Sequence, residues 1–206
     1  MNYANALQNL AVIRMARSEY GAADPLLSEA LDLTLEYNSE DSYEVAAAKG
    51  NLAIAKFQLK EDEAARTLFE SSQRVMNTYE EVGPEYFNII YNYGSLLSEN
   101  GEHEKALALF VELVDYYNEG TPSFEYGSML IKVGDALDQL GRFSEAVSQY
   151  ELAIENFTYL GEQNSEEYSI ALNNLTIDLQ KTGQFGRATE LIEELVLQKE
   201  AEQVTN

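Results

Sequence analysis

Apolar positions recur along the chain in five copies of one pattern. A large residue marks the centre of each copy, at intervals of 42, 41, 40 and 42 residues. It is Leu10, Leu52, Tyr93, Val133 and Leu175 in turn. Within the copies, apolar residues stand three or four positions apart, as in Ala188, Leu191 and Leu195, which is the period of one face of an α-helix. The pattern predicts an all-α chain of five repeated units.

Each copy continues with a turn residue, an alanine and a second large residue. The turn residues are Ser18, Lys60, Gly101, Gly141 and Gly183. Five positions later stand Ala23, Ala65, Ala106, Ala146 and Ala188, and four positions after these Leu27, Phe69, Phe110, Tyr150 and Ile192. Glycine ends a helix in the left-handed conformation without a Cβ penalty. Alanine lets two helices approach closely while the large residues fill the seam. We therefore expect two helices of about 14–16 residues per copy, joined by a short turn.

The three prolines add detail to these boundaries. Pro122 belongs to a Gly- and Pro-containing connection over residues 118–123, and Pro84 is expected in another connection. Pro25 is expected in the first turn of a second helix, where proline is tolerated.

These slots together resemble the tetratricopeptide repeat: a large residue followed by a small one, a turn glycine, an aromatic and Ala-x-x-x-large. The length of the repeat and its Asn-Leu-Ala centre at residues 51–53 resemble the kinesin light chain type of that family. The resemblance covers nearly the whole chain. It departs from the pattern in having no Trp, no closing proline, and Ser18 and Lys60 in place of the first two turn glycines.

The resemblance implies a right-handed α-solenoid of about ten helices. It implies one domain over residues 1–206, with repeats at about 3–43, 44–85, 86–125, 126–167 and 168–206. The first helix of each repeat would line a concave groove. The function implied is a protein–protein interaction scaffold that binds a peptide or protein segment in this groove. The alternative is a regulatory or assembly array of a larger multidomain signalling or effector protein, which a parent gene extending into another domain would favour.

The charge narrows the class of partner. The formal net charge is −23, which repels phosphate backbones and anionic lipids, so neither nucleic acid nor a membrane is the expected partner. In the predicted first helices we count seven basic residues and four acidic ones, a net charge of +3. The basic ones are Arg14, Arg17, Lys49, Lys56, Lys60, Lys132 and Lys181, and the acidic ones are Glu99, Asp135, Asp138 and Asp178. We therefore expect a nearly neutral groove within an acidic shell.

One polar slot precedes the central large residue and is the main candidate for ligand binding. It holds Asn9, Asn51, Asn92, Lys132 and Asn174. Asparagine is a middling helix former, so its return at a mid-helix position needs a reason. Its amide offers both a donor and an acceptor, which matches a peptide group. In the family that the chain resembles, this slot holds an extended peptide by its backbone. The alternative is that these amides bond to neighbouring helices and stabilise the stack.

Four apolar side chains are expected near this slot. Phe57, Tyr91, Val12 and Ile177 would form pockets for ligand side chains, or would pack between repeats. Only Lys132 stands in a slot suited to clamping a C-terminal carboxylate, so we expect no such clamp.

No motif points to catalysis, a metal or a cofactor. The chain has no Cys and one histidine, His103, which fills the mostly aromatic slot after a turn and is expected to pack there. Adjacent glutamates such as Glu80 and Glu81 do not face each other on a helix. No Gly-rich phosphate loop or HExxH motif is present. We therefore expect a protein that is not an enzyme and binds no cofactor.

The two ends of the array and the compartment complete the expectations. The first helix is apolar on more than one face, through Leu10, Val12 and Ile13 among others, so its edge is expected to form dimers or to meet further repeats. No signal peptide is recognisable, which favours the cytoplasm, although a chain without cysteine suits either side of a bacterial membrane.

Overall fold

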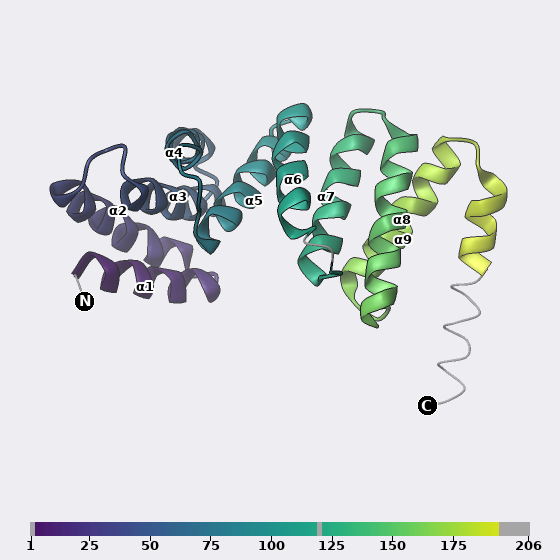
Figure 1. Ribbon diagram of the computed structural model, residues 1–206, viewed down its shortest axis with the longest axis horizontal. Helices are drawn as coiled ribbons and strands as arrows, with labels where there is room; N and C mark the ends of the chain where they lie inside the picture. Colours follow the sequence, from purple (N-terminus) through teal and green to yellow (C-terminus); the bar gives the residue numbers. More distant parts are fainter. Residues whose placement is uncertain (1–2, 119–120, 194–206) are drawn as a thin grey trace. The chain divides into compact units, whose positions relative to one another are not determined.

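The computed structural model describes residues 3–118 and 121–193, and their regular secondary structure is α-helical (Figure 1). The helices are α1 (Tyr3–Ala16), α2 (Tyr20–Tyr37), α3 (Tyr43–Gln58), α4 (Asp62–Met76), α5 (Pro84–Glu99), α6 (His103–Tyr117), α7 (Phe124–Gln139), α8 (Phe143–Leu160) and α9 (Glu166–Lys181). Residues 185–193 are helical as well, which makes ten helices in the described part of the chain. They form sequential antiparallel pairs, as the sequence predicts. None of these helices is both long and apolar enough to cross a lipid bilayer.

The chain forms two compact units. Unit 1 is Met1–Asn100 and contains α1 to α5, and unit 2 is Gly101–Asn206 and contains α6 to α9 and the helical residues 185–193. Within each unit a helix packs mainly against its neighbours in the sequence, and α3 also packs against α5 and α7 against α9. Two first helices of consecutive repeats therefore lie side by side in each unit, α3 with α5 and α7 with α9. The extent of a single domain over residues 1–206 stays a prediction.

The alanine slot is buried between the helices in every repeat. All five alanines are buried, with at most 2% of their surface exposed. In unit 2 the approach is so close that a Cβ on Gly134 of α7 would lie 2.5 Å from Cε1 of Tyr150 on α8. Small residues at this seam let the large side chains of the next slot fill it, and Phe69 and Tyr150 are almost completely buried there.

The turn between the helices of each repeat has one geometry in all five copies. The turn residue has a positive φ throughout: 59° at Ser18, 62° at Lys60, 78° at Gly101, 72° at Gly141 and 75° at Gly183. At Lys60 the amide bonds to the carbonyl of Phe57, and the next amide, of Glu61, bonds to the carbonyl of Lys56. This pattern satisfies the last carbonyls of the first helix. Ser18 and Lys60 therefore do the same work as the glycines, at the cost of a strained backbone.

The starts of the first helices follow from their sequence. The side chains of Ser42, Ser123 and Ser165 accept hydrogen bonds from backbone amides in the first turns of α3, α7 and α9. The expectation that Pro84 lies in a connection is wrong, because it is the first residue of α5, where its missing N–H costs nothing. The expectation for Pro25 is wrong, because α2 begins at Tyr20 and Pro25 lies inside the helix. There it deprives the carbonyl of Gly21 of its helical donor.

Two residues of the repeated core are exposed instead of buried. Leu10 is 42% exposed and Ile192 is 43% exposed, whereas their counterparts in the inner repeats, such as Leu52 and Phe69, are buried. A repeat buries these side chains only against a neighbouring repeat. In the described residues α1 has a neighbour on one side only, which also leaves Tyr3, Val12 and Ile13 exposed.

Candidate functional site

The polar slot lies on the first helices, in α1, α3, α5, α7 and α9, as the sequence predicts. Its five residues differ in environment. Asn9 is exposed, Asn51, Lys132 and Asn174 are half-buried, and Asn92 is buried with 8% of its surface exposed. The five polar side chains of the slot therefore differ in how much of their surface a ligand can reach.

Asn92 is held within its own helix. Its Nδ2 donates to the backbone carbonyl of Asn88 at 2.8 Å and to the Oδ1 of Asn88 at 3.1 Å. A ligand that used this amide group would have to replace these bonds. Asn88, one turn earlier on α5, is exposed and carries a second amide toward the same side of the helix.

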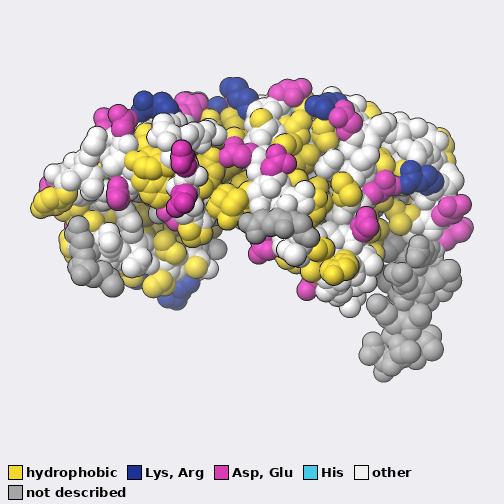
Figure 2. All heavy atoms as spheres, in the orientation of Figure 1, with side chains coloured by type: hydrophobic (Ala, Val, Ile, Leu, Met, Phe, Trp, Pro, Cys, Tyr) yellow, Lys and Arg dark blue, Asp and Glu magenta, His cyan; other side chains and the backbone are white. Residues whose placement is uncertain are grey.

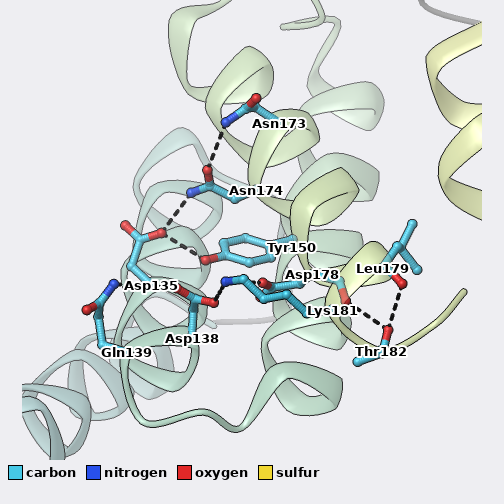
Figure 3. A network of polar contacts seen from close by, with 10 residues as sticks. All are labelled: Asp135, Asp138, Gln139, Tyr150, Asn173, Asn174, Asp178, Leu179, Lys181 and Thr182. Atoms are coloured by element: carbon cyan, nitrogen blue, oxygen red, sulfur yellow. Dashed lines mark hydrogen bonds and ion pairs between the residues drawn. The ribbon is translucent and has the colours of Figure 1, made fainter. Parts of the chain in front are cut away.

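Asn174 belongs to a polar network that joins α7, α8 and α9 (Figure 3). Its Nδ2 donates to Oδ1 of Asp135 on α7 at 2.9 Å, and the hydroxyl of Tyr150 on α8 donates to the same oxygen at 2.9 Å. The Nδ2 of Asn173 donates to Oδ1 of Asn174 at 3.3 Å. Burial raises the pKa of Asp135, while the bonds from Tyr150 and Asn174 and the charge of Lys132 act to lower it. The amide of Asn174 thus ties two consecutive first helices together.

A second part of the network surrounds Lys181 on α9. Its ammonium group forms ion pairs with Asp138 of α7 and with Oδ1 of Asp178, the latter at 2.9 Å. It also lies 4.7 Å from the centre of the Phe143 ring. Asp178 is 1% exposed, and its Oδ2 has no hydrogen-bond partner in the described residues. Burial raises the pKa of Asp178, the neighbouring Asp138 adds to the rise, and Lys181 opposes it.

The apolar residues expected near the slot fall into two groups. Phe57 is 3% exposed, so it is part of the core, and Tyr91 is half-buried. Val12 and Ile177 are 48% and 43% exposed. A ligand would reach Val12 or Ile177 directly, but Phe57 only if its neighbours moved.

The sequence pattern singled out only Ile177 of one exposed face of α9. Ile170 and Ile177 are 40% and 43% exposed and stand seven residues apart, with the exposed Asn173 between them. Residues at this spacing share one side of a helix. The leucines of α9, such as Leu172 and Leu179, are buried. The signal in the sequence is that α9 carries more large aliphatic residues than one stripe needs.

The prediction that the first helices carry a net charge of +3 is wrong. The helices begin earlier than the charge count assumed and include five first-turn glutamates, Glu44, Glu85, Glu125, Glu166 and Glu167. Arg17 and Lys60 lie beyond the helix ends. Five basic and nine acidic residues remain, a net charge of −4.

Most of these basic residues are already paired with carboxylates. Lys49 pairs with Glu40, and Lys56 pairs with Asp24 and Glu61. Lys132 forms no ion pair in the described part of the chain, although its charge acts to lower the pKa of Asp135. Acidic side chains are spread over the face shown in Figure 2, with few basic ones among them.

The remaining candidates for chemistry are unpromising. His103 begins α6 and is half-buried, and its Nδ1 is buried without a hydrogen-bond partner among the described residues. No group of three or more His, Cys, Asp or Glu side chains in the described residues could hold a metal ion.

Comparison with known proteins identifies the repeat. The profile described as "Tetratricopeptide repeat" matches residues 2–78 and 85–159. No curated protein sequence matches the chain significantly.

Solved structures with the same fold share little sequence with the chain. A putative kinesin light chain of Podosopora anserina with nearly identical TPR-like repeats has a TM-score of 0.80 at 17% identity, covering 97% of this chain and 96% of that one. BtubC (BKLC) from P. vanneervenii has a TM-score of 0.77 at 18% identity, covering 96% and 80%. A Rap protein complexed with Competence and Sporulation Factor has a TM-score of 0.63 at 19% identity, covering 91% of this chain and 51% of that one. At these identities the likeness shows the fold.

Proposed function

Because the chain belongs to the tetratricopeptide repeat family, whose domains are in general protein-interaction modules, we propose that it is a scaffold that binds an extended segment of another protein along the exposed faces of its first helices. Arrays of this kind present extended binding surfaces built from equivalent positions of successive repeats. The Rap protein of the same fold, which is complexed with Competence and Sporulation Factor, supports a binding role for such an array.

The observation that carries the proposal is the exposed face of α9. Ile170 and Ile177 offer apolar surface, and Asn173 between them offers a donor and an acceptor. Burying the exposed part of one such side chain, about two fifths of its surface, contributes about 0.6–1.3 kcal/mol. An extended segment has both requirements, because its side chains need apolar contacts and its peptide groups need partners. The half-buried Lys132 on the adjacent α7 adds a cation that forms no ion pair in the described residues, suited to an acidic or carbonyl group of the segment.

The polar slot supplies further contacts in this proposal. Asn9 and Asn51 in unit 1 bind peptide groups of the partner, with the half-buried Tyr91 as an apolar contact. Asn92 and Asn174 exchange their bonds to Asn88 and Asp135 for bonds to the ligand, so they contribute less. The chain acts by holding its partner and not by catalysis.

Selection of peptides on the purified chain tests this function. A displayed library of random 15-residue peptides is selected on the immobilised chain, and the affinity of enriched peptides is measured by fluorescence anisotropy. Ile177→Lys should weaken binding several-fold, because the loss of about 1 kcal/mol of apolar burial approaches the value of about 1.4 kcal/mol that corresponds to tenfold.

The matched control is Leu152→Lys on α8, since Leu152 is 44% exposed, close to the 43% of Ile177. This variant should bind the selected peptides like the wild type, and both variants should melt at the wild-type temperature. Failure to enrich any peptide argues against the function. Equal effects of the two variants argue against the α9 face.

Self-association through the N-terminal edge is a second part of the proposal. Tyr3, Leu10, Val12 and Ile13 expose apolar surface on α1, with exposed fractions of 42% to 60%. Sedimentation velocity should show dimers that increase with protein concentration, and Ile13→Lys should return the chain to a monomer. A wild-type monomer at every concentration contradicts this part and leaves the peptide-binding proposal untouched.

A further inference from the structure

A cavity of about 390 Å³ opens in unit 1. It lies between the first half of α1, the end of α2 and the start of α3, with one residue from α5. Its lining residues are Ala4, Asn5, Gln8, Thr34, Asn38, Tyr43, Glu44, Ala47 and Glu85. Its volume lies near the lower end of the range of about 300–1,000 Å³ for ligand pockets, so it has room for a single large side chain.

The lining is rich in hydrogen-bond acceptors and has no Lys, Arg or His. Glu44 and Glu85 contribute carboxylates, and Asn5 and Gln8 contribute amides. Asn38 uses its Nδ2 to hold the carbonyl of Thr34 at 2.9 Å, which leaves its Oδ1 as an acceptor. Thr34 and Asn38 also mark the C-terminal end of α2, the negative pole of that helix. Each of these features favours a cation.

The wall that carries Tyr43 is fixed by bonds to the connection before α5. The backbone amide of Tyr43 donates to the hydroxyl of Tyr79 at 3.0 Å, and the amide of Gly83 donates to the hydroxyl of Tyr43 at 2.6 Å. The rings of Tyr43 and Tyr79 meet edge to face with their centres 5.3 Å apart. Burial raises the pKa of Tyr43, the hydrogen bond from the Gly83 amide acts to lower it, and the nearby Glu85 raises it further. The Glu85 carboxylate therefore lies near the Tyr43 hydroxyl, and both belong to the lining of the cavity.

We propose that this cavity receives an arginine side chain of the partner protein, with Glu44 and Glu85 as its counter-charges. The proposal rests on the proposed function, since it names one side chain that the bound protein carries. A guanidinium group has five donors in one plane and pairs with carboxylates through two bonds at once, so it can satisfy several of the acceptors that line the cavity. A lysine ammonium has three donors around one point and would leave more of the acceptors unpaired.

Backbone-resolved NMR titration tests the site with small probes. The full chain is titrated with N-acetyl-arginine amide, N-acetyl-lysine amide and N-acetyl-norleucine amide. The arginine probe should cause saturable shifts at the amides of cavity residues such as Gln8 and Ala47. The lysine probe should bind several-fold more weakly, and the norleucine probe should cause no shifts there. Equal binding of the arginine and lysine probes, or shifts spread over the acidic surface, would overturn the proposal.

Two sets of variants separate charge from shape. Glu44→Gln together with Glu85→Gln should weaken the binding of the arginine probe at least tenfold, while Gln keeps the size and one acceptor oxygen of each side chain. Glu125→Gln together with Glu167→Gln removes the same charge from equivalent first turns of unit 2 and should leave the affinity unchanged. Ala47→Met keeps every charge and fills part of the cavity, so it should also weaken binding. An unchanged affinity in the Glu44/Glu85 variant, or an equal loss in both glutamate variants, would overturn the site.

The result is distinguishable from failure of the proposed function. Peptides selected on the wild type should contain arginine more often than those selected on the Glu44/Glu85 variant. If peptides are selected without enrichment of arginine, and the arginine probe shifts no amide signals of the cavity residues, the chain binds protein segments but the cavity does not bind arginine. If the arginine probe binds the cavity but no peptide is selected, the proposed function fails while the site stands.

Discussion

The hydroxyl of Tyr150 donates a hydrogen bond of 2.9 Å to Oδ1 of Asp135, an oxygen that also accepts from Asn174. Tyr150 fills the large slot of the second helix of its repeat, so a residue of the repeated core also serves the polar network. The carboxylate of Asp135 on α7 therefore bonds to α8 through Tyr150 and to α9 through Asn174.

Tyr150→Phe should destabilise the chain by about 1–3 kcal/mol, because it keeps the ring but leaves the largely buried Asp135 with one donor fewer. Urea unfolding followed by circular dichroism should show a lower midpoint. Tyr159→Phe is the control, since Tyr159 is 77% exposed and should lose little. Equal midpoints for Tyr150→Phe and the wild type would mean that the bond contributes nothing.

Gly134→Ala should cost about 1–3 kcal/mol through overpacking. The new Cβ would lie 2.5 to 2.9 Å from three atoms of the Tyr150 ring, which is buried and has no room to move. Gly21→Ala in α2 is the matched control, because its Cβ would meet no atom within 4 Å. That change should stabilise the chain by about 0.5–1 kcal/mol, since alanine is the better helix former. Thermal melts of the two variants should therefore shift in opposite directions.

Ser18→Gly should stabilise unit 1 by up to about 1 kcal/mol. Ser18 has a φ of 59°, a conformation that costs an L-residue about 1–2 kcal/mol, and the greater freedom of glycine in the unfolded chain offsets part of the gain. Gly141→Ala creates the same strain in unit 2 and should lower the stability by a similar amount. Chemical denaturation of both variants measures the two effects, and a Ser18→Gly variant less stable than the wild type would show that the serine compensates its strain in another way.

Asp178→Asn should stabilise the chain more at pH 7 than at pH 4. Burial raises the pKa of Asp178 in the folded chain above its value of about 3.9 in the unfolded chain. Between these two values the folded chain binds more protons, so the free energy of unfolding falls as the pH rises through this window. Asparagine removes that contribution and still offers an oxygen to Lys181, while Asp138, Asp135 and Tyr150 remain in place. Asp135, whose pKa is also raised, keeps part of the pH dependence. Urea unfolding at both pH values checks the difference, and an equal effect at pH 4 and pH 7 contradicts it.

Much of the fold could be predicted from the sequence because the repeat averages over five copies. The alanine slot is buried in every copy, and the turn residue is left-handed in every copy, Ser18 and Lys60 included. What could not be predicted depends on single repeats. Leu10 is exposed because its packing partner would be a preceding repeat, and the pattern treats all copies as interior ones.

The candidate site was less predictable because side-chain partners are not periodic. The slot places Asn92 and Asn174 correctly on their helices, but one bonds within α5 and the other reaches Asp135 on α7. The predicted charge of the first helices was wrong because it depended on where each helix begins. When the start of a helix lies one turn earlier, the helix includes a further glutamate such as Glu44 or Glu85.

The left-handed turn at Ser18 and Lys60 bears on how such arrays are found in genomes. A search pattern that requires glycine at that position would overlook two of the five copies here, although their backbone is the same as in the other three. The tightly packed alanine five residues later is the more dependable marker, since any larger side chain there would push the two helices apart. Diverged arrays should therefore be counted by their alanines first and by their glycines second.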